Sequence, residues 1–266
     1  MAIPKTAEIN NHLWGARAHD WAHIQEGTCK PVYSAVFDRV GLQRDAAYLD
    51  VGCGSGVATQ VAFEHGACVS GLDATENLLA IARTRVPDGT FHTGDLENLP
   101  FSDDSFDLVT GFNAFQYAGD PNAALVEAKR VARQDGVIVI MTWGEPKGMD
   151  AAKLVAALKP LLPAPPPGAS GPFSLSDETT LREFASTAGL SPVEVFDVSA
   201  PWHYPDLETT LRGLKSAGVA VRAIEHTSEA AVDAAYSDAL NPFQQPDGSY
   251  RIGATYRCLI ARVESK

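Results

Sequence analysis

Three glycines within nine residues form the part of the chain with the clearest chemical meaning. The segment from Tyr48 reads YLDVGCGSG, in which an apolar run leads to a carboxylate, Asp50, and then to Gly52, Gly54 and Gly56. Glycine lets the backbone turn sharply and lets a ligand approach main-chain N–H groups where a Cβ would block it. A buried strand that runs into such a turn predicts a site for a nucleotide-like molecule.

Two positions in this segment argue against a dinucleotide. A loop that binds NAD holds a pyrophosphate at the start of the next helix and has a third glycine three residues after the second, where this chain has Val57. Asp50 would lie near the diphosphate, and like charges about 4 Å apart at a protein surface repel by roughly 4 kcal/mol. The loop therefore favours a cationic ligand without phosphate.

Two more acids close the next apolar stretches. Asp73 follows Gly71 and Leu72, and it lies 73 − 52 = 21 residues after the first glycine of the loop. At this spacing a carboxylate can accept hydrogen bonds from both ribose hydroxyls. Asp95 follows Gly94 at the end of a third apolar stretch. We therefore expect three acids at the tips of neighbouring strands.

These motifs, in this order, resemble those of the class I S-adenosylmethionine-dependent methyltransferases. The run LPFSDDSFDLV at 99–109 is similar to a signature of the ubiquinone/menaquinone-type subgroup, and the resemblance is specific over about residues 46–145. It implies S-adenosylmethionine as cofactor and S-adenosylhomocysteine as product. It also implies that Asp95 accepts from the adenine amine and that Leu96 contacts the ring.

The resemblance extends to a set of candidate cofactor residues. Backbone atoms of Phe112 and Asn113 are expected beside the aminocarboxylate, and Cys53 is expected to be a small loop residue with an inert thiol. The full predicted set is Asp50, Gly52, Cys53, Gly54, Gly56, Asp73, Ala74, Asp95, Leu96, Phe112, Asn113 and Tyr117.

A catalytic base is not evident from the sequence. Many small-molecule relatives carry a histidine after the fourth strand, where this chain has Phe115 and Gln116. The candidates are therefore His19, His23 and Tyr33. The two histidines share a helical face, but a third ligand at suitable spacing is missing, so we expect no metal site.

Aromatic and polar residues near the expected sheet edge are candidates for contact with the acceptor. They are Trp21, Phe115, Gln116, Trp143, Trp202 and His203. The chain contains no NPPY or DPPY tetrapeptide, the signature of enzymes that methylate amide or base nitrogens, and this lowers the weight of that substrate class.

The elements that must position these residues alternate between apolar strands and helices. Strands are expected at 46–51, 67–72, 90–94, 106–112, 137–143, 193–198 and 250–263. One helix should begin at an Asp120 cap with Pro121 and stop at Gly136, and another should run from a Ser176 cap to Gly189. This order predicts an α/β fold, a Rossmann-like three-layer α/β/α sandwich, and the resemblance implies a seven-stranded, mostly parallel sheet.

We expect one domain over residues 1–266, with the cofactor-binding core at 41–145. A helical cap at 6–40 and a helical lid at 206–240, inserted between the last two strands, should determine the acceptor. The proline-rich segment 160–172 is expected to be a stiff extended connector.

Charge and cysteine content limit the partners. The chain has 21 basic and 33 acidic residues, the wrong sign for binding nucleic acid through phosphates. Its four cysteines form no C-x-x-C pair, which fits a reducing cytoplasm. The first eleven residues lack signal-peptide features, and the longest apolar run, 137–143, is too short to cross a membrane.

The sequence therefore predicts in-line methyl transfer to oxygen, nitrogen or carbon of a small molecule. Quinone-like, polyketide and other phenolic or enolic acceptors are expected first, from subgroup resemblance alone. Two alternatives stay open, an NAD(P)-dependent oxidoreductase and a protein that binds S-adenosylmethionine without transferring methyl. The sequence does not determine the oligomeric state.

Overall fold

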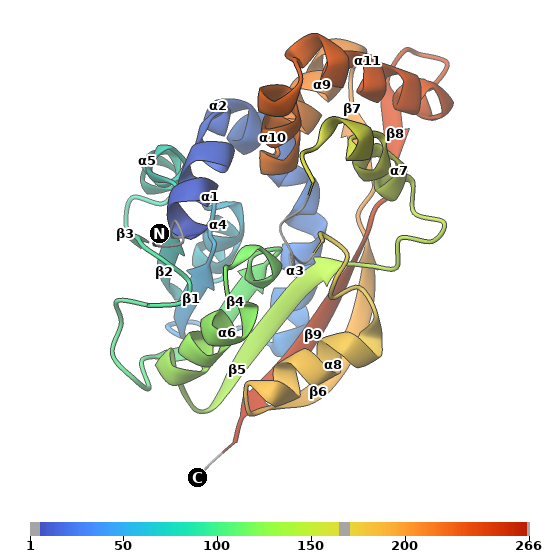
Figure 1. The fold of residues 1–266 in the computed structure, drawn as a ribbon. Coiled ribbons are helices and arrows are strands. Elements are labelled where there is room, and N and C mark those ends of the chain that lie inside the picture. Colours follow the sequence, from blue (N-terminus) through green and yellow to red (C-terminus); the bar gives the residue numbers. More distant parts are fainter. Residues whose placement is uncertain (1–5, 165–170, 265–266) are drawn as a thin grey trace.

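The computed structural model describes residues 6–164 and 171–264, and a seven-stranded sheet runs through its centre (Figure 1). The strand order is β3-β2-β1-β4-β5-β9-β6, with β9 antiparallel to both of its neighbours. The strands are β1 Ala47–Val51, β2 Cys68–Asp73, β3 Thr90–Thr93, β4 Phe106–Phe112, β5 Ala132–Trp143, β6 Leu190–Ser199 and β9 Thr255–Val263. The predicted Rossmann-like fold is confirmed.

Alternating side chains divide the core into one layer on each face of the sheet. Tyr48 belongs to the core cluster on one face and Leu49 to the cluster on the other, as the two-residue period of a strand requires. Helices α3 Lys30–Val40, α4 Val57–Glu64 and α5 Glu76–Arg85 cover the first face, and α6 Pro121–Val131 and α8 Glu178–Thr187 cover the second.

Local capping sets where the helices of the second face begin. Asp120 accepts hydrogen bonds from the backbone N–H groups of Asn122 and Ala123 at 3.0 and 3.1 Å, and Pro121 occupies the first turn, as predicted. The cap of α8 is Asp177, which accepts from Thr180 N at 2.8 Å, so the prediction of Ser176 was wrong by one residue.

Two predicted boundaries differ because strand pairing takes precedence over local signals. Helix α6 ends at Val131 rather than at Gly136, since Ala132 already pairs with Phe106 in the sheet. The predicted strand 250–263 is two strands. Its first part, β8 Tyr250–Ile252, pairs with β7 Trp202–Tyr204 in a separate ribbon, and β9 begins only at Thr255.

Helices occupy both segments left over by the sheet. The N-terminal one contains α1 Thr6–Gly15, α2 Ala18–Asp20, the π-helix η1 Trp21–Gln25 and the 3₁₀ turn η2 Glu26–Cys29, followed by α3. The insertion contains α9 Leu207–Lys215, α10 Gly218–His226, α11 Glu229–Leu240 and η5 Asn241–Phe243. Shorter elements are η3 Phe115–Tyr117, α7 Asp150–Ala157 and η4 Lys159–Leu161.

The insertion packs against the N-terminal segment above the carboxyl ends of the central strands (Figure 1). Arg212 Nη2 donates to Asp20 Oδ1 at 2.6 Å, and Tyr204 OH donates to Gln25 Oε1 at 2.6 Å. The two helical segments therefore form one layer over the sheet edge.

The proline-rich connector and the apolar segments were also the subject of predictions. Within the proline-rich connector, residues 165–170 lie outside the described residues. Among the described ranges, no helix combines the length and the apolar character needed to cross a membrane.

Candidate functional site

The glycine loop after β1 adopts a backbone that other residues would strain. Gly52, Gly54 and Gly56 have φ angles of 74°, 54° and 80°, in the left-handed region. A Cβ on Gly52 would lie 2.6 Å from the Cβ of Ala114, so this position also lacks space for a side chain. The backbone N–H groups of Gly52 and Cys53 both donate to Leu72 O, which fixes the loop against β2.

Asp50 is buried beneath this loop. Its side chain is 1% exposed, Oδ1 accepts from Thr110 Oγ1 at 3.0 Å and Oδ2 from Thr59 Oγ1 at 3.3 Å. Burial raises the pKa of Asp50 to about 8, against the opposing effect of these hydroxyls. At neutral pH the group is therefore mostly protonated, which corrects the sequence-based picture of Asp50 as a charge at the mouth of the site.

The two other acids lie at the ends of β2 and β3. Asp73 Oδ2 accepts from Gly54 N at 2.9 Å and Oδ1 accepts from Thr75 N at 2.8 Å. Desolvation raises the pKa of Asp73, although the backbone donors oppose it. Asp95 Oδ1 accepts from Glu97 N at 3.1 Å within a turn. The expected arrangement of acids at adjacent strand ends is thus present.

The segment after β4 brings a residue with left-handed backbone and a buried amide to the same edge. Asn113 has a φ of 51°, and its N–H donates to Met141 O at 3.0 Å. Gln116 is 5% exposed, and its Nε2 donates to Asn113 Oδ1 at 2.9 Å. Within the described residues, Gln116 Oε1 has no hydrogen-bond partner. This edge therefore retains one buried acceptor that a ligand could satisfy.

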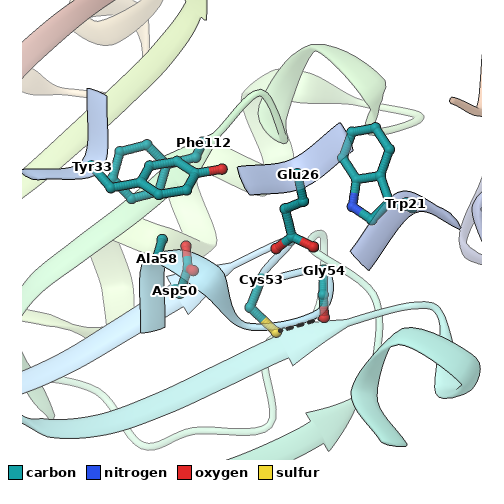
Figure 2. A pocket seen from close by; sticks show the side chains of 9 residues that line it. Trp21, Glu26, Tyr33, Asp50, Cys53, Gly54, Ala58 and Phe112 are labelled. Carbon is teal, nitrogen blue, oxygen red and sulfur yellow. Dashed lines mark hydrogen bonds between the residues drawn. The ribbon is translucent and has the colours of Figure 1, made fainter. Parts of the chain in front are cut away.

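A cavity of about 40 Å³ lies between the glycine loop, the end of β4 and the N-terminal segment (Figure 2). Its volume exceeds what one water molecule needs and is far below the roughly 300 Å³ of a small-molecule pocket. The lining residues are Trp21, Glu26, Tyr33, Asp50, Gly52, Cys53, Gly54, Ala58 and Phe112.

Of the three candidate bases, Tyr33 lines the cavity. Its ring lies 4.6 Å from that of Phe112, between centroids, and burial holds the pKa of the phenol well above its usual value. Tyr33 is therefore suited to donate a hydrogen bond rather than to remove a proton. The rings of His19 and His23 lie 4.3 Å apart, between centroids, on the exposed side of the segment and do not line this cavity, so their role as a base stays a prediction.

The acceptor-side candidates divide into two groups. Trp21 lines the cavity, and Trp143 stacks on Tyr256 with centroids 5.1 Å apart. Trp202 Nε1 donates to Tyr256 OH at 3.1 Å. Trp143 and Trp202 thus share one aromatic cluster with Tyr256, whereas Trp21 packs edge-on against Trp14 with centroids 4.8 Å apart.

His203 and Phe115 do not line this cavity, and their contact with the acceptor stays a prediction. His203 is exposed because it alternates with the inward-facing Trp202 and Tyr204 on β7. Phe115 is 1% exposed and packs in the core cluster that includes α6 and α8. Each side chain therefore points away from the cavity.

The remaining cofactor candidates stay close to the loop and strand ends. Cys53 is buried in the loop, and desolvation raises the pKa of its thiol well above the usual value, consistent with an inert side chain. Ala74, Leu96 and Tyr117 are half-buried, and Tyr117 packs edge-on against Trp14 at 5.8 Å. Within the described ranges, no group of three His, Cys, Asp or Glu side chains could hold a metal.

Sequence analysis missed Glu26, which is 5% exposed and lines the cavity. Its carboxylate accepts hydrogen bonds from Ser55 and Val57, 29 and 31 residues away in sequence. The feature that marks Glu26 is its burial against the glycine loop. Local sequence patterns do not reveal burial that depends on distant residues.

Comparison with known sequences places part of the chain in a known family. Residues 49–140 match the family model described as a methyltransferase domain. A malonyl-[acyl-carrier protein] O-methyltransferase of Geobacter sulfurreducens is 30% identical over 213 residues, which cover 77% of each chain. A demethylmenaquinone methyltransferase of Renibacterium salmoninarum is 34% identical over 111 residues, so the match spans 42% of this chain and about half of that protein.

Solved structures share the fold at low sequence identity. The YcgJ protein of Bacillus subtilis has a TM-score of 0.58 at 21% identity, covering 88% of this chain and 99% of its own. The [4+2]-cyclase SpnF has a TM-score of 0.57 at 20% identity, covering 89% and 81%. A shared fold at this distance does not by itself give the reaction, because the function depends on the site.

Proposed function

This chain belongs to the class I S-adenosylmethionine-dependent methyltransferases, and we propose that it transfers the methyl group in line to oxygen, nitrogen or carbon of a small-molecule acceptor. One observation carries the proposal. A glycine loop with three left-handed residues lies among acids at the ends of three adjacent parallel strands. Such a loop admits a nucleoside close to the backbone, and the acids favour a ligand that brings hydroxyls and positive charge.

The residues at this edge fit the cofactor. Asp73 would accept from the ribose hydroxyls, since each of its oxygens has one further lone pair beyond the bonds to Gly54 and Thr75. Asp95 and Leu96 would hold the adenine. The loop glycines and the backbone of Phe112 and Asn113 would border the aminocarboxylate end. When bound, S-adenosylmethionine supplies a methyl group that its sulfonium already makes electrophilic.

The protein's contribution to rate would then be mainly orientation and exclusion of water. The walls of the cavity include the rings of Trp21, Tyr33 and Phe112, which leave little room for solvent (Figure 2). Holding the reacting groups in line in a dry site contributes up to roughly 7–11 kcal/mol through effective molarity. A base is required only for an acceptor that must first lose a proton.

Residues 6–40 are proposed as a cap on the cofactor and 206–240 as a lid on the acceptor. The close packing of α9 on η1 supports this, since a Cβ on Gly213 would lie 2.8 Å from Ile24 Cγ2. Trp143 and Trp202 pack against each other with ring centroids 5.9 Å apart, and such rings suit contact with planar phenols and quinols. The two named relatives differ in acceptor, one quinone-type and one carried by a protein, so both classes belong in the test.

Calorimetry and a labelled-methyl assay test the proposal in two stages. The first compares the binding of S-adenosylmethionine, S-adenosylhomocysteine and NAD(P)H to the full chain, and we expect only the first two to bind. The second incubates the protein with methyl-labelled S-adenosylmethionine and a panel of quinols, polyketide phenols and malonyl-acyl carrier protein. Binding of NAD(P)H with exclusion of S-adenosylhomocysteine would refute the assignment.

A further inference from the structure

Glu26 anchors the N-terminal segment directly on the glycine loop. Its Oε2 accepts from the backbone N–H of Ser55 at 3.1 Å and also from the Ser55 hydroxyl. Its Oε1 accepts a single, longer hydrogen bond from Val57 N, at 3.3 Å. Since a carboxylate oxygen has two lone pairs, Oε1 keeps capacity for a second and stronger donor.

The nearest cation does not use this capacity. Arg85 Nη1 donates to the carbonyl and hydroxyl oxygens of Ser55 at 2.6 and 2.5 Å, and its Nη2 donates to Ala22 O at 3.1 Å. Its guanidinium therefore joins the loop to the N-terminal segment on the side of Ser55. Burial raises the pKa of the Glu26 carboxyl group. The attraction from Arg85 and the hydrogen bonds that Glu26 accepts oppose this effect but do not cancel it.

The cavity beside Glu26 has an excess of acidic groups. Its nine lining residues include two carboxyl groups, Glu26 and Asp50, and none of the nine is Lys, Arg or His. Figure 2 shows the Glu26 carboxylate directed at the Cys53–Gly54 turn, between Trp21 on one side and Tyr33 with Phe112 on the other. Acidic groups without a basic side chain in the same cavity lining favour a cation that can also donate hydrogen bonds.

We propose that Glu26, on the N-terminal segment, binds the ammonium group of the cofactor's methionyl end through the free capacity of its Oε1. The inference rests on the proposed function, because it takes S-adenosylmethionine as the ligand of the loop. The proposal gives the N-terminal segment a direct contact with the cofactor. The Glu26 side chain would then both fasten this segment to the glycine loop and recognise the aminocarboxylate end.

Isothermal titration of Glu26→Gln with three ligands tests this assignment. S-adenosylmethionine and S-adenosylhomocysteine both carry the ammonium, whereas 5′-methylthioadenosine lacks the whole aminocarboxylate. Gln keeps the size of the side chain and removes its charge. We expect Kd to rise on the order of 10- to 100-fold for the first two ligands, the usual loss for a charged hydrogen bond, and to stay within about threefold for the third.

Glu64→Gln is the matched control, because Glu64 is an exposed acid on α4 paired with Gln60. It should leave all three Kd values unchanged. If Glu26→Gln does not fold by circular dichroism, Glu26→Asp keeps the charge but shortens the reach, and it should weaken the two ammonium ligands several-fold while sparing 5′-methylthioadenosine.

The alternatives give distinct results. Equal weakening of all three ligands would mean that Glu26 only fastens the segment to the loop, and unchanged Kd values would mean that it makes no contact. A loss confined to S-adenosylmethionine would point to the sulfonium. Each of these results overturns the ammonium assignment, whereas failure of the unmodified protein to bind S-adenosylmethionine overturns the proposed function instead.

Discussion

Replacing Asp50 by Asn should remove a pH dependence of stability that the wild-type protein has. The folded-state pKa of Asp50, about 8, lies above the value of 3.8 for an unburied side chain. Between these two values the folded protein holds one more proton at this site than the unfolded chain does. Its stability is therefore fully present below about pH 4 and falls as pH rises towards 8.

The size of the effect follows from the width of this window. Each pH unit inside it changes the free energy of unfolding by about 1.4 kcal/mol, so the three units from pH 5 to pH 8 correspond to roughly 4 kcal/mol. Asn matches the shape of a protonated Asp and can still accept from one of the two hydroxyls of Thr59 and Thr110. Between pH 5 and pH 8, the free energy of unfolding of Asp50→Asn should therefore fall by about 4 kcal/mol less than that of the wild type.

Urea unfolding at pH 5 and pH 8 measures the difference directly. The contributions of Glu26 and Asp73, whose pKa values are also raised, are common to both proteins and cancel to first order. Asp45→Asn is the control, because Asp45 is exposed in a left-handed turn that Asn tolerates. Parallel pH profiles for the wild type and Asp50→Asn would refute the argument that Asp50 is buried and protonated.

Three further outcomes follow from the same site. Affinity for S-adenosylmethionine should rise from pH 6 to pH 8 in the wild type, because a cation favours ionised Asp50, and calorimetry should find this rise lost in Asp50→Asn. Asp73→Ala and Asp95→Ala should each raise the Kd for S-adenosylhomocysteine about tenfold or more with unchanged circular dichroism, and unchanged Kd values would remove their assignment. The double replacement of His19 and His23 by Ala should leave turnover within about twofold, since both are exposed and neither lines the cavity, and a tenfold loss would instead support a catalytic role for them.

The sequence predicted those parts of the site that local patterns mark. Asp50, Asp73 and Asp95 stand at strand ends that short apolar runs and glycines mark, so their common edge follows from parallel strand order. The glycine loop was predictable for the same reason, because its φ angles are a local requirement. These features depend on neighbours within a few residues.

The features that the sequence did not predict depend on contacts between distant segments. The position of the Glu26 side chain depends on hydrogen bonds from loop amides about 30 residues away. The orientation of His203 depends on the pairing of β7 with β8. The break at Gly253 arises because residues 250–252 join that ribbon instead of the main sheet. Local periodicity carries no information about which of two sheets a strand joins.

The sequence suggested that Asp50 selects a cationic methyl donor over a diphosphate, whereas the structure points to Glu26. Asp50 is mostly protonated at neutral pH, so its charge alone would repel a diphosphate weakly. Glu26 instead occupies the N–H groups of Ser55 and Val57, at the start of α4, where a dinucleotide loop would hold its pyrophosphate. A diphosphate at this place would have to displace the Glu26 carboxyl group from these amides. The Glu26 carboxyl group thus accepts from amides at the start of the helix that a phosphate would otherwise use, and we propose that the remaining capacity of its Oε1 serves an ammonium.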